Sequence, residues 1–365
     1  MTNNPVSIGG INTKWTWSRG VPRLKWFPKV IQGDLTEPYY ELDESVVWIP
    51  YHSFFAQNPG HLVWDDFLPV YTLLRIFFLV GDGYTPLLQR FILPGKGMWA
   101  TCDMNPEKQQ ICHSMYKKFL PLFGLSIHNF TTTEDFEFAP KAKEEPKKKT
   151  SLVCAKQGAA GLGMLTDHGY KLHGWSKKDY ETMHNHGRGS MLYDFRNFML
   201  NNVLGASKNK EDLRKGPPYV ITFADGTSRS SLRNFGFELQ MKALQEAFGN
   251  QVIVQKIAFA THSLEEQLKI ASETSIYVSA CGGGAVTATF LPKGAALVLF
   301  YVETGGVQNN RNTGLPARLD WDVFNNMAWI RSHWLPSTSM DNVSDVELFT
   351  KLVGHELDLM EHQEI

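Results

Sequence analysis

Three consecutive glycines stand between two apolar segments in the second half of the chain. The stretch runs from Ser275 through Cys281-Gly282-Gly283-Gly284 to Thr287 and beyond. Glycine lets backbone approach a ligand closely, and the first turn of a helix offers N–H groups without intrahelical partners and a partial positive charge. The pattern therefore predicts a strand, a turn and a helix start that bind a phosphate or diphosphate. The predicted contacts are Gly282, Gly283, Gly284 and Thr287, with Cys281 as a further candidate. A tight turn that only packs the helix on the sheet is the alternative.

Two arginines could supply positive charge to the same ligand. Arg229 and Arg233 follow an apolar, β-rich run at residues 219–223. They would then lie at the carboxyl edge of a parallel sheet, where ligands of open α/β sheets bind. Two guanidinium groups at this edge could clamp a diphosphate. The alternative is a loop that faces solvent.

A histidine and two acids form a second candidate site in the first half, in the sequence Asn58-Pro-Gly-His61-Leu-Val-Trp-Asp65-Asp66. On a helix, His61 and Asp65 share one face because they are four residues apart, whereas Asp66 lies about 100° away. An aspartate beside a histidine can act as a positioned general base. Acids that stabilise a helix N-terminus are one alternative, and a metal pair is another, although two ligands are weak support for a metal.

A third cluster, His184-Asn-His186-Gly-Arg188-Gly, combines histidines with glycines. This composition is consistent with a loop near a ligand, for which His186 is the candidate contact, but it is also typical of an ordinary surface loop.

The elements that must position these residues alternate regularly after a polar, proline-rich segment at 207–218. Apolar runs predict strands, and spacing with a period of 3.6 predicts helices. The sequence Ser263-Leu-Glu-Glu266 predicts a helix that begins with a capping box. Alternating strands and helices indicate a doubly wound parallel sheet. The predicted strands are 219–223, 251–255, 275–280 and 295–302, and the predicted helices are 237–248, 263–271 and 285–291.

The first half is also mixed, with predicted strands at 45–50 and 151–155 and predicted helices at 61–79 and 193–204. We therefore expect two α/β domains that face each other, with the site in the cleft between them. The expected boundaries are an N-terminal acceptor-side domain at 1–206, with a charged loop at 140–150, and a nucleotide-binding domain at 207–340. Residues 341–365 are expected to form a helix that returns to the N-terminal domain.

Composition excludes several classes of protein. Among 365 residues, 36 Lys and Arg balance 37 Asp and Glu, so no global field would attract nucleic acid or an anionic membrane. Four cysteines without a C-x-x-C pair do not make a disulfide scaffold or a zinc ribbon; Cys102 and Cys112 could bridge, but their spacing does not require it. No apolar run reaches the roughly 20 residues of a membrane span, and no signal peptide is evident. We expect a soluble, cytoplasmic chain, or a lumenal one if an anchor has been removed.

Three stretches resemble glycosyltransferase family 61, which includes plant-type xylosyl- and arabinosyltransferases and animal N-acetylglucosaminyltransferases. They are the segment from Asn58 to Pro69, the segment from Cys154 to Met164, and the block from Ser228 to Val302. The last of these contains Ser263, Glu266 and the glycine turn followed by Phe290-Leu-Pro-Lys-Gly. Together the three stretches span about residues 45–305.

The resemblance implies a GT-B architecture of two facing Rossmann-like domains. It also implies an inverting transfer from a UDP-sugar to a glycan hydroxyl without an obligatory metal or other cofactor. Asp65 would be the general base, with His61 as its partner or as an alternative base. Donor contacts would come from the arginines and glycines named above, together with Ser263, Glu266 and Thr287.

Two departures from the family pattern fall near the expected donor site. Cys281 replaces a usual histidine, and Leu299 replaces a usual glutamate, for which Glu303 could substitute. The donor could be UDP-xylose or UDP-N-acetylglucosamine, and these departures favour xylose.

Two other functions remain open. Gly282-x-Gly284 after a strand, with Glu303 after the next one, partly fits a dinucleotide fingerprint and hence an NAD(P)-dependent oxidoreductase, although its third position is Thr287. A catalytically degenerate carbohydrate-binding protein would also explain the departures at Cys281 and Leu299.

Overall fold

The structure is a computed structural model in which the chain forms two compact units. The first comprises Met1–Leu120 and Leu125–Tyr170, and the second comprises Pro121–Gly124 and Lys171–Ile365. Both are α/β, and each contains a parallel sheet. The described residues are 6–7, 25–26, 39–51, 53, 56–78, 84–90, 102, 105–132, 152–159, 180–181, 183, 185–205, 216–225, 235–301, 315–336 and 343–362.

The second unit is built on a five-stranded sheet whose order is β10-β9-β11-β12-β13. Every neighbouring pair is parallel. The central strands are apolar because both faces of the sheet are covered, and all five residues of β11 are buried. The strands are β9 (Tyr219–Ala224), β10 (Val252–Ile257), β11 (Ile276–Ala280), β12 (Ala296–Tyr301) and β13 (Arg331–Pro336).

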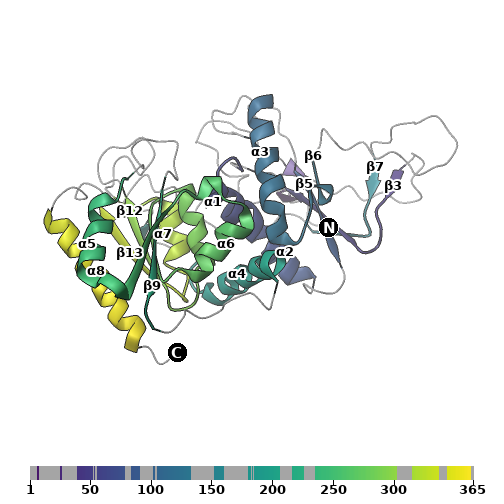
Figure 1. The fold of residues 1–365 in the computed structure, drawn as a ribbon. Coiled ribbons are helices and arrows are strands. Elements are labelled where there is room, and N and C mark those ends of the chain that lie inside the picture. Colours follow the sequence, from purple (N-terminus) through teal and green to yellow (C-terminus); the bar gives the residue numbers. More distant parts are fainter. Residues whose placement is uncertain are drawn as a thin grey trace. The chain divides into compact units, whose positions relative to one another are not determined.

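Helices cover both faces of this sheet (Figure 1). One face packs against α5 (Glu238–Phe248) and α8 (Val343–His362), with a core of aromatic rings that includes Phe223, Phe300 and Phe349. On the other face are α4 (Gly189–Leu204), α6 (Leu264–Glu273), the 3₁₀-helix η9 (Gly283–Phe290) and α7 (Arg318–Phe324).

The order of the strands creates a switch point between β9 and β11. Chain connections run from β9 outward to β10 in one direction, and from β11 through β12 to β13 in the other. Because right-handed crossovers place the following helices on opposite faces, the ends of β9 and β11 border a crevice. The glycine turn comes directly after β11, so it lies at this position.

The first unit contains a four-stranded parallel sheet in the order β6-β5-β4-β8. A parallel pair, β3 with β7, and an antiparallel pair, β1 with β2, are separate from it. The bounds are β1 (Val6–Ser7), β2 (Lys25–Trp26), β3 (Tyr39–Glu41), β4 (Val46–Tyr51), β5 (Thr85–Arg90), β6 (Phe130–Thr132), β7 (Leu152–Cys154) and β8 (Gln157–Gly158).

A helix with a π-helical centre carries the histidine and acids of the first half. It begins as α1 (Pro59–His61), widens into η1 (Leu62–Phe67) and continues as α2 (Leu68–Phe77). The side chain of Asn58 caps its N-terminus by accepting the Gly60 N–H. Pro69 has no N–H to donate, and the preceding Leu68 N–H bonds to the Val63 carbonyl five residues back, which is the π pattern. The predicted helix at 61–79 therefore forms with a wider turn before the proline.

The helix α3 (Pro106–Phe119) is anchored by a disulfide between Cys102 and Cys112, both fully buried. The spacing of these cysteines left their pairing open, and the fold brings their Cα atoms to 5.8 Å. Cys112 lies in the middle of the helix, so the bond holds the chain before α3 against the helix itself.

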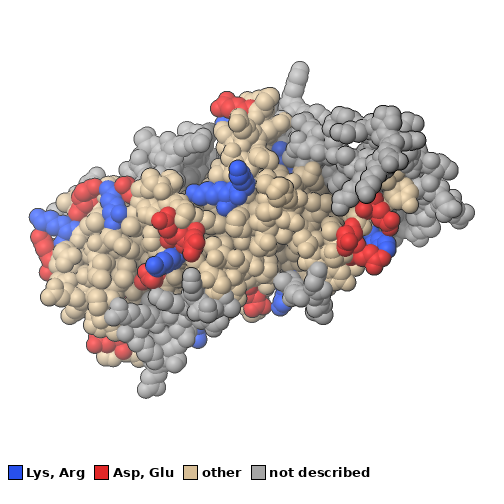
Figure 2. Space-filling model, turned by 45° about the vertical axis from the view of Figure 1, so that its right-hand side comes forward, with Lys and Arg blue, Asp and Glu red and all other residues tan. Residues whose placement is uncertain are grey.

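Several elements differ from the sequence predictions. The prediction omitted β5, α3, α7 and β13, all of which form. The helix α4, expected in the first domain, belongs to the second unit, and α8 packs on α5 within that unit. Among the described helices, none has the length and apolar character needed to cross a bilayer. On the face shown in Figure 2, acidic and basic side chains are scattered in small groups, as expected from the balanced charge.

Candidate active site

The glycine turn has a backbone conformation that requires glycine at its first position. Gly282 has φ 126° and ψ −165°, a region that side-chain-bearing residues essentially avoid. Gly282, Gly283 and Gly284 are all partly exposed, whereas the residues on both sides are buried. The predicted turn is thus an accessible stretch of backbone at the start of a 3₁₀-helix.

A carboxylate that the sequence analysis did not single out holds this turn. The side chain of Asp320, on α7, accepts a hydrogen bond from the Gly282 N–H at 2.5 Å. Asp320 is only 3% exposed, so a buried side chain holds a partly exposed turn from a distant segment. It fixes the position at which the chain leaves β11 for η9.

A buried polar network extends from α7 to the histidine-rich loop. Asn185 donates its amide to Asp322 at 2.7 Å, and Asp322 is paired with Arg318 at 3.5 Å. All three side chains are buried, and no hydrogen-bond partner is found for the Asn185 Oδ1 among the described residues. His186, the residue predicted to contact a ligand, is exposed. The loop therefore contributes to the structure of α7 through Asn185.

Of the other residues predicted at or near the donor site, some have structural partners, some are buried and three lie outside the described residues. Ser263 and Glu266 form the expected capping box of α6, in which each side chain accepts the other's backbone N–H. Thr287 and Cys281 are buried. Leu299 is fully buried on β12. Arg229, Arg233 and Glu303 lie outside the described residues.

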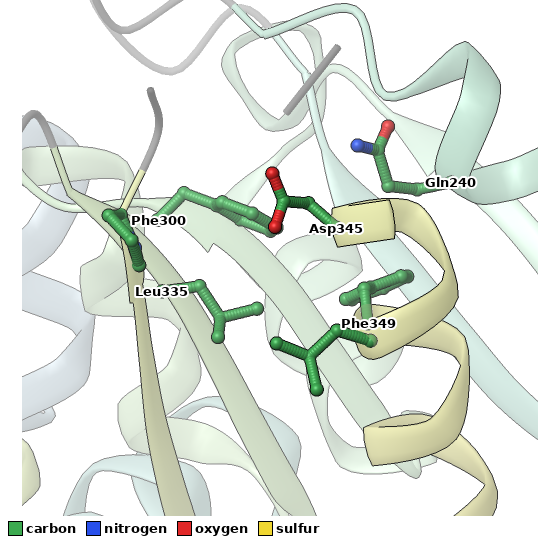
Figure 3. A pocket seen from close by; sticks show the side chains of 7 residues that line it. Gln240, Phe300, Leu335, Asp345 and Phe349 are labelled. Carbon is green, nitrogen blue, oxygen red and sulfur yellow. The ribbon is translucent and has the colours of Figure 1, made fainter. Parts of the chain in front are cut away.

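A small apolar cavity of about 80 Å³ lies at the carboxyl ends of β12 and β13 (Figure 3). It is on the face covered by α5 and α8, and it is lined by Gln240, Phe300, Leu335, Pro336, Asp345, Leu348 and Phe349. Pockets for drug-sized ligands measure roughly 300–1,000 Å³, so this cavity is too small for a nucleotide sugar.

In the first unit, His61 and Asp65 form the pair that their spacing predicts. The His61 Nδ1 lies 2.5 Å from an oxygen of Asp65, one turn along the helix. Asp65 is buried, with 1% of its side chain exposed, whereas 19% of the His61 side chain is exposed. The imidazole is therefore the member of the pair that solvent reaches.

Asp66 has a different environment from its neighbour. One of its oxygens accepts hydrogen bonds from the hydroxyls of Ser53 and Tyr116, each at 2.6 Å. Burial raises the pKa of the Asp66 carboxyl to about 7, and the nearby charge of Asp65 acts in the same direction. Hydrogen bonds from the two hydroxyls and the positive charge of Arg90 oppose this rise without cancelling it. Asp66 is thus a buried acid that titrates near neutral pH.

No family model matches the chain, but a curated protein shows distant similarity to it. Protein O-linked-mannose beta-1,4-N-acetylglucosaminyltransferase 2 of Bos taurus is 24% identical to the chain over 247 residues. The alignment covers 68% of this chain and 36% of the relative, so the chain spans little more than a third of that protein. The chain is distantly similar to a glycosyltransferase. This similarity supports a transferase at the level of class, and it gives no support to the preference for xylose.

Proposed function

We propose that the chain is an inverting glycosyltransferase that moves a sugar from a UDP-sugar to a hydroxyl of a glycan. The observation that carries this proposal is the accessible glycine turn at the switch point of a five-stranded parallel sheet. Ligands of open α/β sheets bind at such points, and a helix start favours an anionic group. The glycine turn alone would suit any nucleotide, and the distant similarity to a glycosyltransferase favours a sugar nucleotide.

The diphosphate of the donor would bind the N–H groups at Gly283 and Gly284, since Asp320 already accepts the Gly282 N–H. Arg229 and Arg233 follow β9, the other strand of the switch point, and would supply cationic charge to the leaving group. In this proposal side chains and helix-end dipoles stabilise the departing UDP, so a metal is not obligatory.

We assign the general base to the pair formed by His61 and Asp65. Asp65 is the base that the family resemblance implies, but the greater exposure of His61 favours the imidazole as the group that meets the acceptor. If Nδ1–H is donated to Asp65, the second ring nitrogen is the basic one. The acceptor oxygen then bonds to the anomeric carbon, the bond from that carbon to the diphosphate oxygen breaks, UDP leaves with the electron pair, and His61 takes the hydroxyl proton.

The GT-B arrangement of the two units is also part of the proposal. N-acetylglucosamine replaces xylose as the first donor to test, because the relative's name specifies that sugar. The same name directs the acceptor test to mannose-containing glycans.

Ligand-dependent thermal stability tests the nucleotide part of the proposal. Melting of the protein is measured with UDP, GDP, CMP and NAD, with and without EDTA, and then with UDP-sugars. A ligand at about 100 times its Kd adds about 2.7 kcal/mol to the stability of the native state. A rise in Tm with UDP that persists in EDTA is expected. A response to NAD with none to any UDP compound would replace the proposal with the oxidoreductase.

Transfer from radiolabelled UDP-sugars tests the chemistry. His61→Gln is expected to lower kcat by about 10²–10⁴-fold with UDP affinity unchanged, which is the usual contribution of a general base. His128→Gln, an exposed histidine of the same unit, is the control and should remain active. A larger loss in Asp65→Asn than in His61→Gln would return the base role to Asp65. UDP binding without any transfer would indicate the degenerate carbohydrate-binding protein instead.

A further inference from the structure

Asp66 belongs to a buried acidic pair inside the π-helical turn. All six residues of η1 are buried, and Asp65 and Asp66 are consecutive within it. Burying a carboxyl group is unfavourable unless hydrogen bonds compensate for the lost water. Asp65 has His61 as a partner on its own helix, whereas the partners of Asp66 come from elsewhere in the unit.

Two hydroxyls from separate elements converge on Asp66 Oδ2. Ser53 lies just after β4, and Tyr116 lies on α3, 50 residues away in sequence from Asp66. The carboxyl group therefore connects the end of a strand, a distant helix and the π-helical turn. Such a three-way contact constrains how the turn can rotate or shift.

Packing fixes the Tyr116 hydroxyl independently of Asp66. The Tyr116 ring is fully buried and stacks on Phe130, with ring centroids 4.3 Å apart. It also makes an edge contact with Phe67, the last residue of η1. Cys112, one helical turn before Tyr116, is held by the disulfide to Cys102. The hydroxyl is thus presented to Asp66 by a rigid part of the unit.

We propose that Asp66 is a positioning residue, whose bonds to Ser53 and Tyr116 hold the π-helical turn so that Asp65 stays paired with His61. This inference rests on the proposed function, because it assigns the pair the work of general base. Asp66 acts through Asp65 and does not meet the substrate, since it is 2% exposed and one of its oxygens accepts two hydroxyls.

The test removes the hydroxyls and observes the His61–Asp65 hydrogen bond directly. Short, charge-assisted hydrogen bonds give proton NMR signals far downfield of the amides, and the signal of this pair is assigned by its loss in His61→Gln. Tyr116→Phe removes one hydroxyl and keeps the ring that stacks on Phe130. Ser53→Ala removes the other hydroxyl and serves as a second variant if Tyr116→Phe folds poorly. Tyr84→Phe, at an exposed tyrosine of the same unit, is the matched control.

The downfield signal is expected in the wild type and in Tyr84→Phe, and it should weaken or shift upfield in Tyr116→Phe and Ser53→Ala. An unchanged signal in both hydroxyl variants would overturn the inference. So would the absence of the signal from the wild type, because there would then be no pair to position.

Kinetics separate a positioning role from a purely structural one. Tyr116→Phe should lower kcat about tenfold, a partial loss of the base contribution, with acceptor KM and UDP affinity unchanged. The Tyr116→Phe, Ser53→Ala double variant should lose less than the product of the two single losses, because both act through one oxygen. Equal losses in kcat and in UDP affinity, or full activity in both variants, would contradict the inference. If the wild type neither binds UDP nor transfers sugar, the proposed function fails, and the NMR result still decides whether Asp66 positions the pair.

Discussion

Asp320 and Gly282 are joined by a side-chain to backbone hydrogen bond across 38 residues of sequence. The bond connects α7, which precedes the last strand of the sheet, to the first glycine of the turn after β11. A buried carboxylate therefore sets the geometry of the backbone that we propose for the diphosphate. Stability and UDP binding should both depend on this contact.

Asp320→Ala should destabilise the second unit. The substitution removes the acceptor of the Gly282 N–H, and a hydrogen bond contributes about 0.5–3 kcal/mol, with the larger values where one partner is charged. Denaturant unfolding measures the loss, and Asp358→Ala, at an exposed position on α8, is the control that should change little. A free energy of unfolding that matches the control would mean that the bond does not contribute.

Gly282→Ala should weaken UDP binding as well as stability. Its conformation is almost restricted to glycine, and forcing another residue into it costs about 1–3 kcal/mol, so the turn is expected to shift. Gly249, with φ 51° and ψ −121° at the end of α5, offers a matched control away from the turn. Gly249→Ala should reduce Tm without changing the Kd for UDP. Equal Kd values in the two variants would remove the turn from the donor site.

The near-neutral pKa of Asp66 makes the first unit less stable as pH rises. The folded-state pKa of about 7 is above the ordinary value of 3.8, so the native state binds more protons than the unfolded chain between these values. The Asp66 contribution is fully present below pH 3.8 and is lost as pH rises through 7, with a slope of at most about 1.4 kcal/mol per pH unit. Unfolding of wild type and Asp66→Asn from pH 4 to 8 measures it.

The difference in stability between wild type and Asp66→Asn should change in favour of the variant as pH rises. The groups that act on the Asp66 carboxyl are Asp65, Arg90, Ser53, Tyr116 and Tyr51. A pH-independent difference between the two proteins would show that Asp66 keeps an ordinary pKa.

Glu356 produces the opposite dependence in the second unit. It is buried on α8 and accepts from Arg331 at 2.6 Å and from His333 at 2.7 Å. Burial raises its pKa, but the two hydrogen bonds and the charges of its partners outweigh burial and lower it below the usual 4.5. Its stabilisation is therefore present above pH 4.5 and is lost as pH falls through the folded-state pKa.

Glu356→Gln should remove this sensitivity to acid and should destabilise the protein at pH 7 by about 1–3 kcal/mol, because hydrogen bonds to a charged group are lost while Arg331 and His333 keep contact with solvent. Glu347→Gln, on the exposed side of the same helix, is the control. Thermal melts of all three proteins between pH 3 and 7 make the comparison, and parallel curves for Glu356→Gln and wild type would refute the assignment.

Local patterns were sufficient to predict much of the second unit. Apolar runs located β9 to β12, and Ser263 with Glu266 correctly predicted a capping box. These features depend on neighbours in sequence. The strand β13 was missed because Arg331 and His333, which pair with Glu356, break the apolar pattern of a buried strand.

The candidate site was predictable only in part, because local sequence patterns do not show contacts between distant segments. The spacing of His61 and Asp65 reports their pairing because both lie on one helix. No local signal connects Asp320 to Gly282 or Tyr116 to Asp66, since those contacts exist only after distant elements have packed. Exposure, on which we rest the proposal of His61 rather than Asp65 as the base, is likewise a property of the folded unit.

The disulfide between Cys102 and Cys112 has a practical consequence for the preparation of this protein. Thiols remain reduced in the cytosol of most cells, so chain produced there would lack the bond unless it formed later. Closing the short loop between Cys102 and Cys112 contributes about 3 kcal/mol to the free energy of unfolding. The bond also holds α3, which presents the Tyr116 hydroxyl to Asp66. Material from an oxidising expression host and material from a reducing one should therefore differ in specific activity as well as in yield.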